Sequence, residues 1–120
     1  MKTETKLIHF SEGIELESGE KLNSFDLMVE TYGELNEGKS NAILLCHAFS
    51  GNHHAAGSSE DFGIGWWDQL VGPGKSIDTN KYFIVCCNNL GGCAGSSGPS
   101  SINPSSQKIF GKSFPQVSVL

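Results

Sequence analysis

The residues of this sequence with the clearest chemical potential lie in the segment NAILLCHAFSGNHH, residues 41–54. Four apolar residues, 43–46, lead directly into His-Ala-Phe-Ser-Gly. A small residue and a glycine let the backbone approach a reacting carbonyl closely. Backbone N–H groups in such a turn stabilise the charge that develops on a tetrahedral intermediate of acyl transfer. The segment predicts half of an oxyanion hole, although a buried strand also ends in His-Ala in many proteins without any catalytic role.

Two apolar runs must position this turn. AILLC, residues 42–46, and YFIVCC, residues 82–87, are continuous rather than alternating, and turn residues flank both. Such runs are typical of neighbouring parallel strands that are buried on both faces. About three dozen residues separate them, which is enough for a crossover connection with a helix. We predict a short helix in this crossover at residues 65–71, GWWDQLV, ended by Gly-Pro-Gly at 72–74.

The residues before the turn have a different pattern. Residues 14–23 predict a strand pair that turns at Ser18 and Gly19. In residues 25–33, apolar Phe25, Leu27 and Val29 alternate with Asp26, Met28 and Glu30, which predicts a half-buried antiparallel strand on an edge side of the sheet. The predicted fold class is therefore α/β, with antiparallel first strands, then parallel buried strands and a crossover helix, in an incomplete sheet.

Composition limits the classes of function. The chain has 120 residues, a length typical of one domain, and a net charge of −5. Its basic residues are scattered lysines, so we expect no nucleic-acid partner. No apolar run approaches the roughly 20 residues that span a bilayer, and the N-terminus lacks the apolar core of a signal peptide. We therefore expect a cytoplasmic protein without a membrane partner.

The four cysteines form no Cys-x-x-Cys pair. Cys46, Cys86 and Cys87 lie inside apolar runs, where a free cysteine behaves as a small hydrophobic residue. We predict that these three thiols are reduced and buried. Cys93 lies in a glycine-rich loop, where we predict the most accessible thiol.

Three other binding sites find weaker support. His47, His53, His54 and Cys93 are the right residue types for zinc, but adjacent histidines on an extended segment point to opposite sides, and no pair has a structural-zinc spacing. The loop GGCAGSSG lacks the Gly-Lys-Ser/Thr of a phosphate-binding loop. Trp66 and Trp67 are better explained by a helix that packs on the sheet than by a stacking platform. We therefore predict no metal site.

Four segments of the sequence resemble, in order and spacing, the N-terminal third of homoserine O-acyltransferases. The segments are LESGEKLNSFDLMVETYGELN, NAILLCHAFSGNHHAAG, GWWDQLVGPGKSIDTNKYFIVCCNNLGGCAGSSGPSSINP and FGKSFPQVSV. The resemblance implies an α/β-hydrolase fold and a role in methionine biosynthesis. It also implies transfer of an acetyl or succinyl group from acyl-CoA to the hydroxyl of L-homoserine through an acylated serine. Acyl-CoA is then a co-substrate, no cofactor is bound, and a homodimer is one arrangement open to the full-length parent.

The resemblance assigns few residues of this chain. Phe49 stands where the family, usually with leucine, has the residue whose backbone N–H serves the oxyanion hole. Ser50 and Gly51 would border the active site, and His47 would be positional rather than the catalytic base. The second bordering loop would contribute Gly91, Gly92, Gly95, Ser96, Ser97 and Gly98.

The departure from the family pattern is larger than the match. The nucleophile should lie in a Gly-x-Ser-x-Gly elbow between a strand and a helix. Residues 95–99, GSSGP, lack the last glycine and follow a loop, so they are rejected. We expect the serine, aspartate and histidine beyond Leu120, and residues 1–120 to be the inactive N-terminal portion of one domain. A serine O-acyltransferase or a non-catalytic binding module is the alternative; the choices of acetyl or succinyl donor and of homoserine or serine acceptor stay open.

Overall fold

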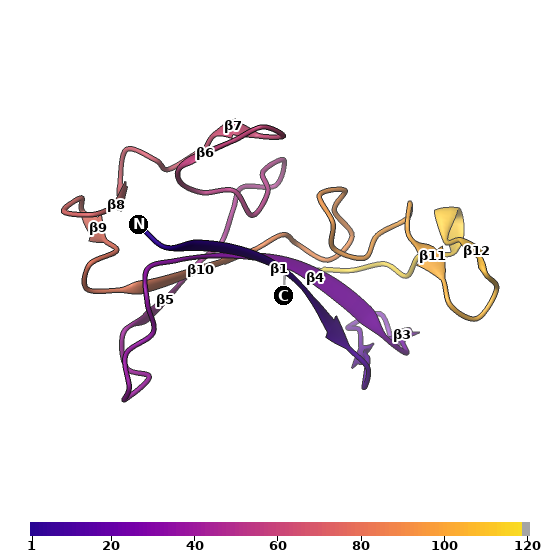
Figure 1. The fold of residues 1–120 in the computed structure, drawn as a ribbon. Coiled ribbons are helices and arrows are strands. Elements are labelled where there is room, and N and C mark those ends of the chain that lie inside the picture. Colours follow the sequence, from indigo (N-terminus) through magenta and orange to yellow (C-terminus); the bar gives the residue numbers. More distant parts are fainter. Residues whose placement is uncertain (119–120) are drawn as a thin grey trace. The chain divides into compact units, whose positions relative to one another are not determined.

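The computed structural model describes residues 1–118 and consists mainly of strands and turns (Figure 1). The longer strands are β1 (Thr3–Phe10), β4 (Phe25–Tyr32), β5 (Ala42–Leu45) and β10 (Phe83–Cys87). Two-residue strands lie between and after them: β2 (Ile14–Glu15), β3 (Lys21–Leu22), β6 (Ser58–Ser59), β7 (Gly63–Ile64), β8 (Val71–Gly72), β9 (Ile77–Asp78), β11 (Ile102–Asn103) and β12 (Lys108–Ile109). A single 3-10 turn, Gly111–Ser113, is the one helical element within residues 1–118.

A four-stranded mixed sheet in the order β1-β4-β10-β5 forms the centre of the fold. Strands β5 and β10 are adjacent and parallel, with Ile43 opposite Ile84, as the two apolar runs predict. Strand β4 is antiparallel to β10, with Tyr32 opposite Ile84. The sheet therefore holds the end of β5 at a defined place, and the His-Ala-Phe-Ser-Gly turn begins there.

The predicted edge position of β4 is wrong, because β1 adds to its outer side and leaves β1 and β5 as the outer strands. Nearly all residues of β1 are exposed. A strand joins a sheet through its backbone N–H and C=O groups, so an exposed strand carries little signal in its side-chain pattern. The sequence pattern therefore does not predict β1.

The expectation that β5 and β10 are buried on both faces is also wrong. In β10, Ile84 and Cys86 are fully buried, while the alternate residues are only half-buried. Leu44 in β5 is 65% exposed. The core cluster that packs on Ile84 includes Ala55, Ala56 and Val71, all from the connection between β5 and β10. This connection covers one face of the sheet. The residues of β10 that point to this face are buried, and those that point to the other face are only half-buried.

The predicted helix at residues 65–71 is absent, and the connection carries the short pairs β6–β7 and β8–β9 in its place. Residues 66–70 are turns, closed by bonds such as Val71 N–H to Trp67 O at 2.9 Å. The backbone here binds another segment: Trp67 N–H donates to Ala55 O and Gly65 N–H to Gly57 O, both at 2.8 Å. A helix that began at Gly65 would leave these N–H groups without a partner inside the helix, and here they bond to the preceding segment.

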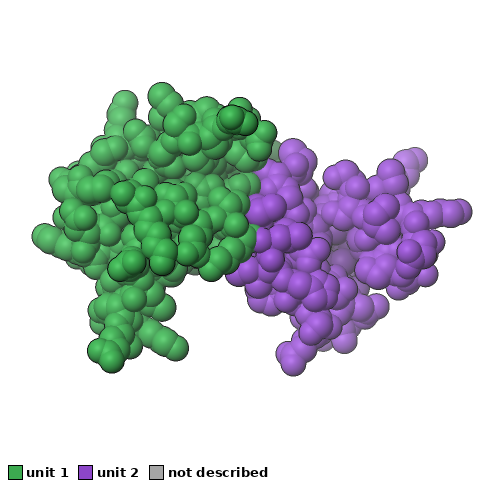
Figure 2. All heavy atoms as spheres, in the orientation of Figure 1, with its two compact units in different colours: residues 1–6, 29–87 green, residues 7–28, 88–120 purple. Residues whose placement is uncertain are grey.

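The chain divides into two compact units, coloured separately in Figure 2. Unit 1 comprises Met1–Lys6 and Val29–Cys87, and unit 2 comprises Leu7–Met28 with the chain from Asn88 onward. Within residues 1–118, no helix has the length and apolar character needed to cross a membrane.

Unit 2 contains the predicted strand pair at residues 14–23. Strands β2 and β3 are antiparallel, and Leu16 N–H donates to Glu20 O at 2.8 Å. Gly19 takes a φ of +86° in the turn, a conformation that favours glycine. This prediction is confirmed.

Candidate active site

The turn after β5 is closed by a hydrogen bond from Gly51 N–H to Ala48 O, with an N···O distance of 2.8 Å. His47 Nδ1 lies 2.7 Å from the same oxygen, so the imidazole braces the turn. A Cβ on Gly51 would stand 3.1 Å from Ala48 O, which explains a glycine there. The result is a tight turn with Phe49 and Ser50 at its two central positions.

Phe49 presents its backbone at the tip of this turn. Its side chain is fully exposed, so it packs against no core. Within residues 1–118, the Phe49 N–H donates to no acceptor. A turn amide of this kind can bind an oxygen that comes from outside the chain.

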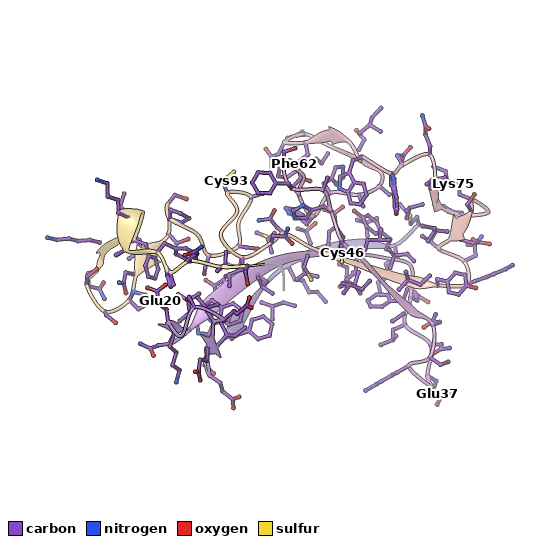
Figure 3. All side chains as sticks on the ribbon, turned by 180° about the vertical axis from the view of Figure 1, so that it is seen from behind. Glu20, Glu37, Cys46, Phe62, Lys75 and Cys93 are labelled. Atoms are coloured by element: carbon purple, nitrogen blue, oxygen red, sulfur yellow. The ribbon has the colours of Figure 1, made fainter. Side chains whose placement is uncertain are left out.

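A hollow of about 590 Å³ lies beside the turn. The hollow is lined by Cys46, which Figure 3 labels, by much of the turn and by the two tryptophans Trp66 and Trp67. Trp66 Nε1 donates to Asn52 O at 2.9 Å. The tryptophan rings, 5.1 Å apart, are each more than a third exposed, so their predicted role in a helix packed on the sheet is wrong. They form a wall of this hollow.

A buried polar network lies behind the segment that follows the turn. Glu30 is 4% exposed, and its Oε1 accepts the Tyr32 hydroxyl at 2.7 Å. The same Oε1 lies 2.8 Å from His54 Nδ1. The Tyr32 oxygen in turn accepts the N–H groups of Ala55 at 2.7 Å and Ala56 at 3.1 Å. Five buried polar groups, three side chains and two backbone N–H groups, thus satisfy one another.

Sequence reasoning missed this network. The alternation in β4 assigned Glu30 to its polar face, whereas Glu30 and Tyr32 share the face that carries the core. The sequence signal for this network was the pair His53 and His54, which follow Glu30 by 23 and 24 residues. These histidines supply the nitrogen partners that a buried carboxylate needs.

The expectation that His53 and His54 point to opposite sides is wrong. Both are buried, and both face Glu30: His53 Nε2 lies 3.9 Å from Oε2, and His54 Nδ1 lies 2.8 Å from Oε1. The segment is bent rather than a regular strand, so the alternation of a strand does not apply. Burial lowers the pKa of His53 and raises that of Tyr32, whose bond to Glu30 adds to the effect. Residues 1–118 contain no group of three His, Cys, Asp or Glu side chains arranged to hold a metal ion.

The glycine-rich loop of residues 91–98 belongs to unit 2, and its two serines bond to neighbouring backbone groups. Ser96 is buried; its Oγ donates to Asn88 O at 2.6 Å and accepts Met28 N–H at 2.9 Å. Ser97 Oγ accepts Asp26 N–H at 2.8 Å. Both hydroxyl oxygens therefore take part in hydrogen bonds within unit 2.

The glycines of this loop allow neighbouring atoms to lie close to its backbone. A Cβ on Gly95, whose φ is +105°, would meet Met28 Cε at 2.6 Å. A Cβ on Gly98 would meet Gly92 O at 2.4 Å, and one on Gly91 would meet Val117 at 3.1 Å. The Phe49 turn belongs to unit 1 and this loop to unit 2.

The cysteines differ in exposure more than the sequence indicates. All four are free thiols; Cys86 is buried and Cys87 half-buried, but Cys46 and Cys93 are exposed. Burial raises the pKa of Cys86 to about 12 and also raises that of Cys87. The predicted burial of Cys46 is wrong because β5 ends at Leu45 and the next residue already belongs to the hollow.

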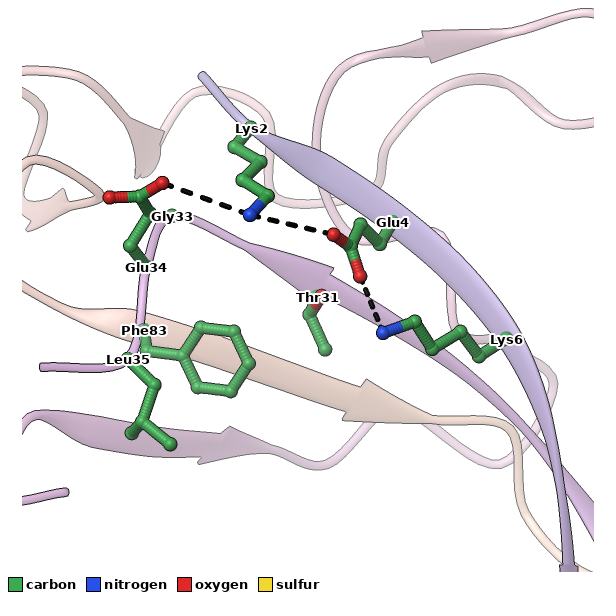
Figure 4. A pocket seen from close by; sticks show the side chains of 8 residues that line it. All are labelled: Lys2, Glu4, Lys6, Thr31, Gly33, Glu34, Leu35 and Phe83. Atoms are coloured by element: carbon green, nitrogen blue, oxygen red, sulfur yellow. Dashed lines mark ion pairs between the residues drawn. The ribbon is translucent and has the colours of Figure 1, made fainter. Parts of the chain in front are cut away.

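A second hollow, of about 470 Å³, lies beside β1 (Figure 4). Its charged groups neutralise one another, since Lys2 pairs with Glu4 at 3.6 Å and with Glu34 at 3.8 Å, and Lys6 pairs with Glu4. The two lysines lower the pKa of Glu4. These internal pairs leave the hollow with little net charge for a ligand, so the Phe49 turn and its apolar hollow are the stronger candidate site.

Comparison with curated proteins identifies close relatives over part of their length. Homoserine O-succinyltransferase of Pseudomonas paraeruginosa is 60% identical over 114 residues, which cover 93% of this chain and 30% of the relative. Homoserine O-succinyltransferase of Hahella chejuensis is 60% identical over 116 residues, which cover 95% of this chain and 30% of the relative. No protein-family model matches the chain.

Solved structures agree with the sequence relatives. Homoserine O-acetyltransferase from Bacillus anthracis has a TM-score of 0.86 and 37% identity, over 98% of this chain and 33% of that one. Esterase E22 has a TM-score of 0.86 and 34% identity, over 98% of this chain and 34% of that one. The predicted resemblance is confirmed: this chain is similar to homoserine O-acyltransferases in sequence and to α/β-hydrolase neighbours in structure, over about a third of their length.

Proposed function

We propose that this chain is part of a homoserine O-acyltransferase, within one α/β-hydrolase domain. The observation that carries the proposal is the 60% identity to homoserine O-succinyltransferases over nearly the whole chain. The substrates are acyl-CoA and L-homoserine, and the chain itself binds no further cofactor. Because the relatives at this identity are named for succinyl transfer, we propose succinyl-CoA ahead of acetyl-CoA as the donor.

In this proposal the Phe49 N–H is one donor of the oxyanion hole. Its place at the tip of the turn and its lack of an acceptor within residues 1–118 support that role. The donor would bind the carbonyl oxygen of the thioester as negative charge develops on it. Ser50 and Gly51 would border the reacting carbonyl. We propose that the second loop also borders the active site, through Gly91, Gly92, Gly95, Ser96, Ser97 and Gly98.

The covalent step needs groups that we propose to lie beyond Leu120. A serine hydroxyl there loses its proton to a histidine and attacks the thioester carbonyl; the C–S bond breaks, and the histidine gives the proton to the departing sulfur as coenzyme A leaves. The homoserine hydroxyl then loses its proton to the histidine and attacks the acyl-serine ester, and the displaced serine oxygen takes that proton back from the histidine. Ser96 and Ser97 are already bonded within unit 2, which supports a nucleophile elsewhere.

One observation favours a second candidate function. Esterase E22 has the same TM-score as the homoserine O-acetyltransferase, at 34% against 37% identity. An esterase would use water in place of homoserine as the acceptor of the acyl group. A homodimer and a cytoplasmic location stay predictions under either function.

Thiol release from succinyl-CoA and acetyl-CoA separates these functions. In the complete enzyme that contains this chain, we expect thiol release that depends on L-homoserine and is faster with succinyl-CoA. Equal release without homoserine would favour hydrolysis, and L-serine tests the alternative acceptor. The 120-residue chain by itself should release no thiol; homoserine-dependent turnover by it would contradict the assignment of the nucleophile to residues beyond Leu120.

A further inference from the structure

The segment from Asn52 to Gly57, which follows the Phe49 turn directly, is bound on two sides by unit 1. We call it the anchored segment. On one side, Trp66 Nε1 donates to Asn52 O, and Trp67 N–H donates to Ala55 O. Gly57 N–H also donates to Asp68 Oδ1 at 2.8 Å. These contacts come from the connection between β5 and β10.

On the other side the anchored segment meets the β4 network. The Tyr32 oxygen accepts two consecutive N–H groups, those of Ala55 and Ala56, and its own proton goes to Glu30. One phenol therefore joins β4 to the backbone of the anchored segment through two hydrogen bonds. All the groups involved are buried, so water does not replace a lost bond readily.

His54 fixes the orientation of the same segment. Its Nδ1 lies 2.8 Å from Glu30 Oε1 and its Nε2 lies 3.1 Å from Gly63 O, so both ring nitrogens face an oxygen. Phe62, labelled in Figure 3, stacks on the ring with a centroid distance of 6.0 Å. The ring has one orientation that satisfies these contacts together.

We propose that Tyr32 and Glu30 are positioning residues for acyl transfer, because they hold the anchored segment and thereby set the place of the Phe49 N–H. The inference rests on the proposed function for its catalytic consequence. Gly51, which closes the turn, is bonded covalently to Asn52, so a shift of the anchored segment reaches the turn through one peptide bond. A catalytic donor displaced by about 1 Å can cost on the order of 10²-fold in rate.

Tyr32→Phe is the first test, since it keeps the ring and removes the hydroxyl. Thr79→Val is the matched control: Thr79 lies in the same unit, is 7% exposed, and has a buried hydroxyl without a hydrogen-bond partner within residues 1–118. Both changes remove one buried hydroxyl, but only the first removes bonds to the anchored segment.

Amide hydrogen exchange of the 120-residue chain measures directly whether the Tyr32 hydroxyl stabilises the anchored segment and the turn. In Tyr32→Phe we expect about tenfold faster exchange at Ala55, Ala56 and Gly51, the amide that closes the turn. Thr79→Val should leave Gly51 at the wild-type rate. Faster exchange at Ala55 and Ala56 with an unchanged Gly51 would overturn the proposal, because the network would then not reach the turn.

Steady-state kinetics of the complete enzyme measure the effect of this positioning on kcat and KM. We expect Tyr32→Phe to lower kcat by on the order of 10²-fold with KM values for both substrates nearly unchanged. Glu30→Gln, which keeps an oxygen for the Tyr32 hydroxyl, should retain more kcat than Glu30→Ala. A kcat of Tyr32→Phe equal to that of Thr79→Val would overturn the proposal. If the wild-type enzyme shows no homoserine-dependent turnover, the proposed function fails, and the exchange at Gly51 decides the positioning role separately.

Discussion

Gly65 lies so close to Ala56 that a Cβ on Gly65 would stand 2.3 Å from the Ala56 nitrogen. The obstacle is backbone, which cannot rotate away as a long side chain would. We expect Gly65→Ala to lower the free energy of unfolding by about 3 kcal/mol through overpacking. Gly38→Ala is the control, since its nearest neighbour, Ser40 Oγ, is 3.8 Å away, and it should change stability by less than about 0.5 kcal/mol. Urea denaturation measures both, and equal midpoints would refute the close approach.

Thiol labelling should follow exposure rather than the apolar runs. We expect Cys46 and Cys93 to react first with an aromatic disulfide reagent, Cys87 more slowly, and Cys86 last. Cys86 is fully buried, and burial raises its pKa to about 12, so it holds little reactive thiolate at neutral pH. Mass spectrometry of time points identifies each site. Rapid labelling of Cys86 in the folded chain would be the contrary result.

His53 should make stability depend on pH. Burial lowers its pKa in the folded protein, below the ordinary value of 6.5 that it regains on unfolding. The unfolded state then binds more protons, so the stabilisation is complete above about pH 6.5 and is lost as pH falls through the folded-state pKa. The pKa values of Asp68 and Asp78 are also lowered in the folded protein. Their contribution to stability is therefore lost only as the pH falls below their ordinary pKa of 3.8.

Urea midpoints between pH 7 and about pH 5 test the His53 effect. The wild-type midpoint should fall with pH more steeply than that of His53→Gln, which has no titrating ring at this position. Parallel pH profiles for the two proteins would show that His53 does not supply the dependence.

Phe49 should tolerate a change of side chain but not loss of its N–H. In the complete enzyme, Phe49→Leu should keep nearly the wild-type kcat, because leucine keeps the backbone N–H and is the residue that the family resemblance gives at this position. Phe49→Pro removes the N–H and should lower kcat by about 10²–10³-fold, the usual cost of one oxyanion donor. Circular dichroism checks that both variants fold. A normal rate for a folded Phe49→Pro enzyme would remove Phe49 from the oxyanion hole.

The sequence by itself determined the main strands of the sheet. The alternation at residues 25–32 and the two apolar runs predict β4, β5 and β10, and the parallel pairing of β5 with β10 follows from the same runs. These features are local, since the side chains of one strand record which environment each face meets. The resemblance to homoserine O-acyltransferases was also available from sequence alone, because it depends on residue order and spacing.

Only the tertiary structure decided which elements share hydrogen bonds and which side chains share a buried space. Strand β1 joins the sheet through its backbone, and the connection after the turn bonds to the anchored segment rather than forming a helix. Glu30 and His54 are 24 residues apart, and nothing local to either shows that they meet at 2.8 Å. Their contact depends on how the chain bends after β5, because a buried carboxylate is stable only where the fold brings donors to it.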